Sequence, residues 1–226
     1  MSTTGGISRE MALINTLGHD LRSPLTAVRG AATLLLQGLD EIPPAKQLEL
    51  LAIIDRRVLQ MSDRIEDIIA VCHLDAGDLN VFLEPVLAET IVARSVDQDH
   101  PQGDGPVDVD MPPPGLMVAA DLERATQAVR ALIANAQRFS EPGLPVTVTV
   151  EADPKAVRFN VSDRGPGLEP DAVEAAFERL SFGAGGGPGL GLYLARGLAR
   201  AMGGDVAHEP RAGGGSTFFL TLKRDA

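Results

Sequence analysis

Two regularly spaced apolar stripes in the first 77 residues constrain the fold more than any other feature of the chain. Their members recur every three or four residues, which is the spacing of one face of a helix, with a stutter near Leu21 in the first stripe. The first stripe comprises Ile14, Leu17, Leu21, Leu25, Val28, Ala32, Leu35 and Leu39, and the second comprises Leu48, Leu51, Ile54, Val58, Met61, Ile65, Ile68 and Cys72. Between them, Gly38 is a helix stop and Pro43-Pro44 a breaker. The pattern predicts a helical hairpin, which we expect to pair with a second copy into a four-helix bundle.

After about Asp78 the periodicity changes to short alternating segments and glycine-rich turns. We predict strands at 81–83, 107–109, 146–151, 156–162 and 216–222, and helices at 121–138 and 190–202. Asp121 is the expected N-cap of the first of these helices. The predicted fold is therefore an all-α hairpin over residues 1–77, followed by an α/β domain over residues 78–226.

Charge and cysteine content narrow the environment and the partners. The formal net charge of −11 repels phosphate backbones, so no nucleic-acid partner is expected. Cys72 is the only cysteine, which excludes a disulfide within the chain and fits a reducing compartment; we expect it to be a small core residue. No apolar run approaches the roughly 20 residues that span a bilayer. We expect a cytoplasmic protein, or the cytoplasmic part of a longer sensor, without direct membrane contact.

His19 stands in the run Gly-His-Asp-Leu-Arg-Ser-Pro-Leu on the first predicted helix. It lies two residues from Leu17 and from Leu21, so its ring should point away from the apolar seam. Asp20 can hold one ring nitrogen and leave the other nucleophilic. Pro24 removes a helical hydrogen bond and should kink the helix beside this pair. Taken alone, an exposed helical histidine is more often an ordinary surface residue.

The other three histidines are assigned no chemistry. His73 should end a helix, His100 and His208 look like loop or surface residues, and the four histidines show no metal-ligand spacing.

Several polar and glycine-rich segments in the second half suggest a nucleotide site. Asn135 offers an amide oxygen to Mg²⁺, and Arg138, three residues later on the same helix face, can meet a phosphate. Asp163 follows a predicted strand and can accept a hydrogen bond from an amino group such as that of adenine. The glycine-rich stretch 183–191 opens a helix and offers backbone N–H groups to phosphates. Each element alone has an ordinary explanation as a helix end, a turn or a linker, but their order is improbable by chance.

With these motifs in this order, the chain resembles the sensor histidine kinases of two-component signalling over nearly all its length. Residues 19–25 look like the H box of that family, 132–140 the N box, 163–168 the G1 box, 177–182 the F box and 187–192 the G2 box. The resemblance implies a dimerisation and phosphotransfer hairpin joined to an α/β sandwich of the Bergerat ATPase type.

The resemblance also implies a reaction and a set of site residues. The γ-phosphoryl group of ATP would pass to His19, with Asp20 as its base, and then to an aspartate of a response regulator. Asn135 would bind Mg²⁺, Asp163 would read adenine, and residues 169–186 would form a mobile lid. The implied nucleotide-binding set comprises Asn135, Arg138, Asp163, Gly165, Gly167, Gly187, Gly189, Leu190, Gly191 and Thr217.

Three positions depart from the family pattern. Ala131 stands where an earlier Asn is usual in the N box, and Arg138 replaces the usual Lys, which keeps the charge but changes the geometry. Ser23 stands where Thr or Asn supports phosphatase activity, and it keeps a hydroxyl on the face of His19.

Two alternatives remain open on the sequence alone. One is an ATP-dead scaffold that relays phosphate between partners, which Ala131 favours. The other is a Bergerat-type ATPase or serine protein kinase, in which the helices only dimerise.

Overall fold

The computed structural model describes residues 4–38, 41–96, 105–111, 113–179 and 189–225, and within the first helix it describes side chains from Leu21 onward. The described residues form two compact units. One extends to Ile68, and the other runs from Ile69 to the C-terminus.

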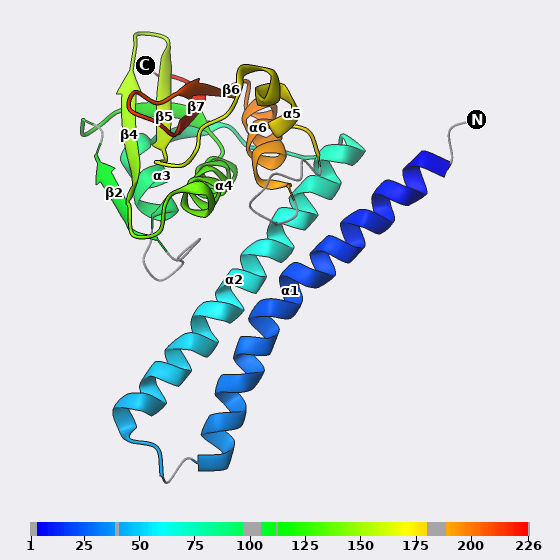
Figure 1. The fold of residues 1–226 in the computed structure, drawn as a ribbon. Coiled ribbons are helices and arrows are strands. Elements are labelled where there is room, and N and C mark those ends of the chain that lie inside the picture. Colours follow the sequence, from blue (N-terminus) through cyan, green and yellow to red (C-terminus); the bar gives the residue numbers. More distant parts are fainter. Residues whose placement is uncertain (1–3, 39–40, 97–104, 112, 180–188, 226) are drawn as a thin grey trace. The chain divides into compact units, whose positions relative to one another are not determined.

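The hairpin predicted from the two stripes is present in the structure. It consists of α1 (Thr4–Gly38) and α2 (Pro44–Ala76), shown in blue and cyan in Figure 1. Its turn is closed by hydrogen bonds from the backbone N–H groups of Glu41 and Ile42 to the carbonyl of Gly38, both 2.9 Å. These bonds occupy a carbonyl that the end of a helix leaves without a partner.

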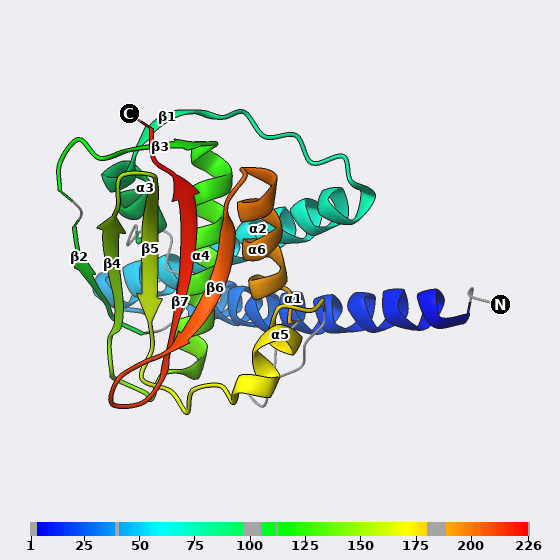
Figure 2. The same cartoon turned by 90° about the horizontal axis from the view of Figure 1, so that it is seen from above.

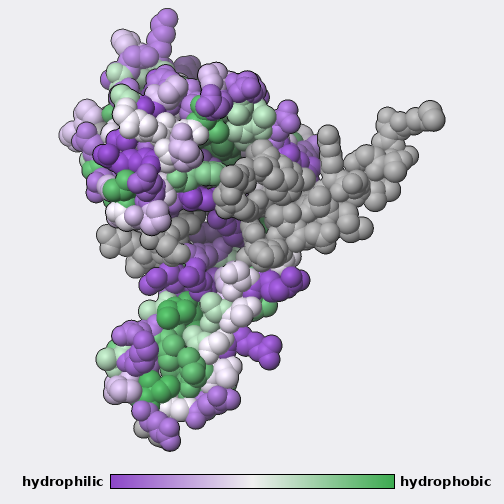
Figure 3. Space-filling model, in the orientation of Figure 1, coloured by the Kyte–Doolittle hydropathy of each residue, from purple (hydrophilic) through white to green (hydrophobic). Residues whose placement is uncertain are grey.

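Many stripe residues of the hairpin are exposed in the single chain. Figure 3 shows apolar side chains gathered on the described part of the hairpin beside its turn. The exposed large apolar residues of α1 and α2 are Leu25, Leu34, Leu36, Leu48, Leu51, Ile53, Val58, Ile65 and Ile69. One pair of helices therefore buries only part of its apolar surface.

The expectation that Cys72 is a core residue is wrong for the single chain, because its side chain is exposed. Its neighbours Ala70 and Val71 are buried instead, each at 1% exposure. The last turns of α2 belong to the second unit, where the side chain of Leu74 lies so close to Gly197 that a Cβ there would clash with it. The buried face of α2 is thus set by this packing and not by the stripe.

The second unit is built on a five-stranded sheet with the strand order β2-β4-β5-β7-β6. Only β2 and β4 are parallel, and the other neighbours are antiparallel. The strands are β2 (Val107–Asp110), β4 (Val146–Ala152), β5 (Ala156–Ser162), β6 (Asp205–Pro210) and β7 (Ser216–Lys223). A separate antiparallel pair joins β1 (Glu84–Leu87) to β3 (Met117–Ala120).

Helices cover one face of this sheet, as Figure 2 shows for α4 (Leu122–Phe139) and α6 (Gly191–Ala201). The shorter helices are α3 (Ala88–Ser95), α5 (Val173–Ala176) and the 3₁₀ turn η1 (Pro170–Ala172). The core between the layers holds fully buried aliphatic side chains and Phe159. Alternation along the strands sends most of their apolar residues, such as Phe218 and Leu220 of β7, to the helix side.

Several predicted elements are confirmed and one is misplaced. The helix capped by Asp121, the hairpin of β4 and β5, the strand at 107–110, the helix entered near Leu190 and the last strand are all present. The strand expected at 81–83 is wrong: β1 starts at Glu84, and Phe82 is 79% exposed. The prediction missed α3, α5, β3 and β6, which are short or carry few apolar residues.

Candidate nucleotide-binding site

Helix α4 brings the predicted N-box residues to the centre of the second unit. Asp121 caps it by accepting a hydrogen bond from the N–H of Arg124 at 3.2 Å. Ala131, Asn135 and Phe139 are spaced by four residues, so they share one face of the helix.

Two glycines mark where other segments approach this face of α4. Gly191 opens α6, and a Cβ there would lie 3.6 Å from the carbonyl oxygen of Ala131. Two turns further along, a Cβ at Gly165 would clash with the carbonyl of Phe139. The two glycine segments therefore flank the helix turn that carries Asn135.

The Asn135 side chain is half-buried, and its amide makes no hydrogen bond to any described residue. A half-buried amide without a protein partner is suited to a ligand or a hydrated ion, and its oxygen is a donor atom that Mg²⁺ accepts. Arg138 is exposed, with its guanidinium carbon 5.1 Å from the centre of the Phe139 ring.

Asp163 is the most tightly held polar side chain of the site, at 3% exposure. Its Oδ1 accepts hydrogen bonds from the backbone N–H groups of Gly165, at 2.8 Å, and Ser216, at 3.1 Å. In return, the N–H of Asp163 donates to the carbonyl of Ser216 at 2.9 Å. Its Oδ2 accepts no hydrogen bond within the described chain. The carboxylate is thus fixed through one oxygen, and the other remains available to a donor such as an amino group.

Two glycines with positive φ shape the turns around Asp163. Gly167 has a φ of +79° and Gly215 a φ of +94°, a region that favours glycine. A Cβ at Gly215 would clash with the carbonyl oxygen of Asp163, so the turn before β7 can lie against Asp163 only without a side chain.

The remaining predicted nucleotide ligands are placed differently. Gly189 adopts a φ of +61° before α6, and Leu190 is buried at 4% exposure, whereas Gly187 lies outside the described residues. The hydroxyl of Thr217 is 2.8 Å from that of Ser162, on the face of β7 opposite Ser216. The structure brings Ser216, and not the side chain of Thr217, to Asp163.

The predicted phosphotransfer residues lie on α1, in the first unit. The backbone of His19 and Asp20 is helical, but their side chains lie outside the described residues, so the exposure of the His19 ring remains a prediction. Ser23 is exposed, and α1 continues through Pro24.

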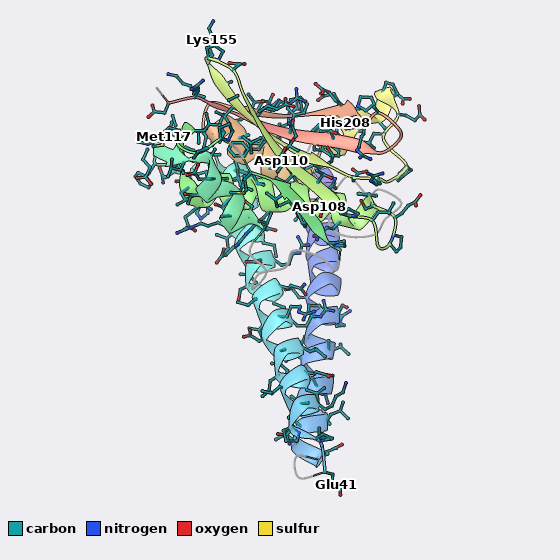
Figure 4. All side chains as sticks on the ribbon, turned by 90° about the vertical axis from the view of Figure 1, so that its left-hand side faces the viewer. Glu41, Asp108, Asp110, Met117, Lys155 and His208 are labelled. Atoms are coloured by element: carbon teal, nitrogen blue, oxygen red, sulfur yellow. The ribbon has the colours of Figure 1, made fainter. Side chains whose placement is uncertain are left out.

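The sequence missed His208, which is neither a loop nor an exposed surface residue. It lies on β6 (Figure 4), is half-buried, and places its Nε2 3.0 Å from the hydroxyl of Ser216. Its ring centre is 5.0 Å from that of Phe218. Alternation along β7 was the signal that could have found Ser216, whereas β6 carries no comparable signal for His208.

The predicted F box begins at Phe177, which is buried beside this cluster at 6% exposure. Its ring stands edge-on to Phe218, with centres 6.0 Å apart, and the Arg196 guanidinium lies 4.5 Å from its centre. Arg196 also pairs with Glu174 of α5 at 2.9 Å. The described part of the predicted lid around Glu174 and Phe177 therefore packs against α6 and β7.

Among the described residues, no group of three or more His, Cys, Asp or Glu side chains could hold a metal ion by itself. The same part of the chain contains no helix of the length and apolar character needed to cross a membrane. The fold and the site together define an α/β unit with a candidate nucleotide site and a helical hairpin with a candidate phospho-acceptor.

Comparisons with known proteins identify both units. Residues 10–77 match the model of the His Kinase A (phospho-acceptor) domain. Residues 120–226 match that of the histidine kinase-, DNA gyrase B- and HSP90-like ATPases. The chain belongs to the sensor histidine kinases.

Three relatives illustrate the similarity. The histidine-protein kinase/phosphatase MprB of Mycolicibacterium paratuberculosis is 32% identical over 95% of this chain and 43% of its own. The sensor protein KdpD of Clostridium acetobutylicum is 27% identical over 94% of this chain and 24% of its own. The crystal structure of full-length ShkA in complex with AMPPNP is 28% identical with a TM-score of 0.63, over 94% of this chain and 46% of that one. The chain thus spans less than half the length of these relatives.

Proposed function

We propose that this chain is a histidine autokinase that transfers the γ-phosphoryl group of ATP to His19 and then to an aspartate of a response regulator. The arrangement around α4 carries the proposal. Gly165 and Gly191 flank the turn of Asn135, and Asp163 keeps one carboxylate oxygen available. Since ATP is the phosphoryl donor, the proposal places both units in the cytoplasm.

The polar groups of the second unit suit the two ends of ATP. Asp163 Oδ2 would accept a hydrogen bond from the adenine amino group, while the backbone at Gly189 and Gly191, at the start of α6, would border the phosphates. Arg138 would supply a positive charge that favours a phosphate group. Ala131 is buried at 8% exposure where α4 meets the start of α6, and its methyl group offers no ligand atom to Mg²⁺ or phosphate.

Mg²⁺ fits the residues present, because the half-buried Asn135 amide has no hydrogen-bond partner within the described chain. Asn135 would supply one oxygen ligand, and the ion would neutralise charge on the phosphates when bound. The ion takes few ligands from protein when phosphates and water supply the rest, which agrees with the lack of an acidic cluster in the described residues.

The reaction at His19 requires a neutral imidazole with one free nitrogen. That nitrogen attacks the γ-phosphorus, the bond to the β,γ-bridging oxygen breaks, and ADP leaves with the electron pair. The proton on the other ring nitrogen passes to Asp20, which follows His19 in the same turn of the helix. In the second step, a carboxylate oxygen of the regulator attacks the phosphorus and the N–P bond of His19 breaks.

Ser23 supports a further phosphatase activity toward the regulator. It is exposed and lies four residues after His19, on the same helix face. Its hydroxyl could orient a water molecule for attack on an acyl phosphate. The relative MprB is named a kinase/phosphatase.

The hairpin is proposed to form a homodimer. Its exposed leucine, isoleucine and valine side chains form an apolar surface that the single chain does not cover. A second copy supplies the same surface in the same register, and a four-helix bundle buries both.

The proposal is tested by incubating the chain with γ-labelled ATP and Mg²⁺. We expect label on the wild-type chain that is stable in base and labile in acid, as a phosphoramidate is. His19→Ala should abolish it. His73→Ala is the matched control, since His73 is an exposed helical histidine paired with Asp78 at 2.8 Å; it should label like wild type.

The same assay decides between the proposal and its alternatives. Absence of label on every residue of the wild-type chain would support the ATP-dead scaffold. Acid-stable label, or label that passes to another protein regardless of His19→Ala, would support a serine kinase or ATPase.

A further inference from the structure

His208 lies between Asp163, the proposed adenine ligand, and Phe177 of the predicted lid. Its Nε2 lies 3.0 Å from the Ser216 hydroxyl, and the N–H of Ser216 donates to Asp163 Oδ1 at 3.1 Å. On its other side, the ring packs against Phe218, which in turn contacts Phe177.

The residues that connect His208 to Asp163 are rigidly held. Ser216 and Asp163 are each 3% exposed, and they exchange two hydrogen bonds. Gly215, immediately before Ser216, lies directly against the Asp163 carbonyl. Because Ser216 and Asp163 are closely packed, a change at the half-buried His208 ring acts directly on its neighbours Ser216 and Phe218.

We propose that His208 is a positioning residue of the nucleotide site, and that its neutral imidazole keeps Ser216 and Asp163 in the geometry that accepts the base. Protonation of His208 then weakens nucleotide binding. The inference rests on the proposed function, since it takes Asp163 as the residue that receives the adenine amino group.

The charges around His208 favour the neutral ring at neutral pH. Burial lowers the pKa of His208 below 6.5, and the negative charges of Asp163 and Glu209 oppose this shift only in part. The Glu209 carboxylate forms a salt bridge with the Arg158 guanidinium, at an N–O distance of 2.7 Å. Beyond Phe177 lies Arg196, which pairs with Glu174 at 2.9 Å and with Asp205 of β6 at 3.1 Å.

Protonation would change two interactions at once. A neutral ring can donate or accept through Nε2, whereas an imidazolium can only donate, so a Ser216 hydroxyl that had donated to the ring would have to turn. The new positive charge would also attract the Asp163 carboxylate and compete with the amino group of the ligand. Both effects reduce nucleotide affinity as the pH falls below 6.5 toward the lowered pKa of His208.

The test is calorimetric titration of the chain with ADP and Mg²⁺ between about pH 7.5 and about pH 5.5, the range around an ordinary histidine pKa. His208→Gln keeps an Nε2 amide that can bond to Ser216 but does not titrate. His208→Val removes the hydrogen bond, and His73→Gln serves as the matched control on an exposed histidine.

Between the upper and the lower pH, we expect the ADP affinity of wild type and of His73→Gln to fall about threefold to tenfold more than that of His208→Gln. This factor corresponds to the net free energy of one ordinary hydrogen bond. A loss of ADP affinity that is common to all variants is attributed to titration of the ADP phosphate. His208→Val should bind more weakly than His208→Gln by a similar factor at the upper pH, with thermal unfolding showing that both variants are folded.

The inference is overturned if His208→Gln retains the wild-type pH dependence, or if folded His208→Val binds ADP as tightly as wild type. A wild-type chain that binds no ADP at any pH would instead overturn the proposed function, on which the inference rests.

Discussion

The hairpin and the sheet unit are equally regular in sequence, yet they bury their apolar residues to very different extents. In the sheet unit, Val148, Val157, Phe159 and Leu220 are completely buried within the single chain. In the hairpin, stripe residues such as Leu48 and Leu51 are 67% and 51% exposed. The comparison teaches that a helical stripe specifies a surface to be covered, whereas a sheet with helices on one face already covers itself.

The largest expected effect is the loss of a core side chain from the sheet unit. Phe159→Ala should lower the free energy of unfolding of this unit by about 3–5 kcal/mol, because the ring is fully buried and its removal leaves a cavity. Guanidinium unfolding followed by circular dichroism measures the change.

Phe82→Ala is the matched control, because Phe82 belongs to the same unit but is 79% exposed. Its substitution should change the unfolding free energy by no more than about 0.5 kcal/mol. Equal losses for the two variants would contradict the assignment of the core to the space between sheet and helices.

A smaller effect is expected on self-association, and it compares the two regions through two leucines of nearly equal exposure. Leu51 of α2 is 51% exposed and Leu83 of the sheet unit is 53% exposed. If a second copy covers the hairpin, Leu51→Ala should weaken self-association by roughly 1.5–3 kcal/mol per dimer, because both copies lose half a side chain of burial.

Sedimentation equilibrium measures this effect, and Leu83→Ala should associate like wild type. A wild-type chain that stays monomeric at high concentration, or an equal effect of both substitutions, would show that the exposed hairpin stripe has another role.

What the sequence predicts well is what local chemistry determines. Asp121 with the helix after it, and the alternating segments that form β4 and β5, carry strong signals within a few residues. Alternation along β7 could also have been used further: Phe218 and Leu220 face the core, so Ser216 shares their face and Thr217 does not. The role of Thr217 as a nucleotide ligand stays a prediction.

Other features depend on partners far along the chain and left no local signal. Cys72 belongs to the second stripe, but the packing of Leu74 against Gly197 turns Ala70 and Val71 inward. His208 is buried because β6 adds to the edge of β7, and β6 itself, with two acidic residues and a proline, does not look like a strand. The positions of His19 and Asp20 along α1 follow from the pattern, whereas their side-chain exposure remains a prediction.

The smallest effect concerns the last turn of α2, which belongs to the sheet unit by packing although its sequence belongs to the hairpin. The Tyr193 hydroxyl donates to Asp75, and Arg179 pairs with the same carboxylate. Burial and then this hydrogen bond raise the pKa of Tyr193 from 10.0 to about 12. Because the raised pKa favours the neutral phenol, its contribution to stability is present below pH 10 and is lost as the pH rises toward 12.

Tyr193 is the only tyrosine and the chain has no tryptophan, so ultraviolet difference absorbance of tyrosinate reports this one group. Asp75→Asn should lower its pKa to between 10 and 12, since burial remains while the charge is removed. Asp78→Asn, three residues further along and paired with His73, should leave the titration unchanged. Circular dichroism at each pH shows that the chain is still folded. If the Tyr193 phenol of Asp75→Asn titrates as in wild type, the last turn of α2 does not pack on α6 in solution. That turn would then belong to the hairpin and not to the sheet unit.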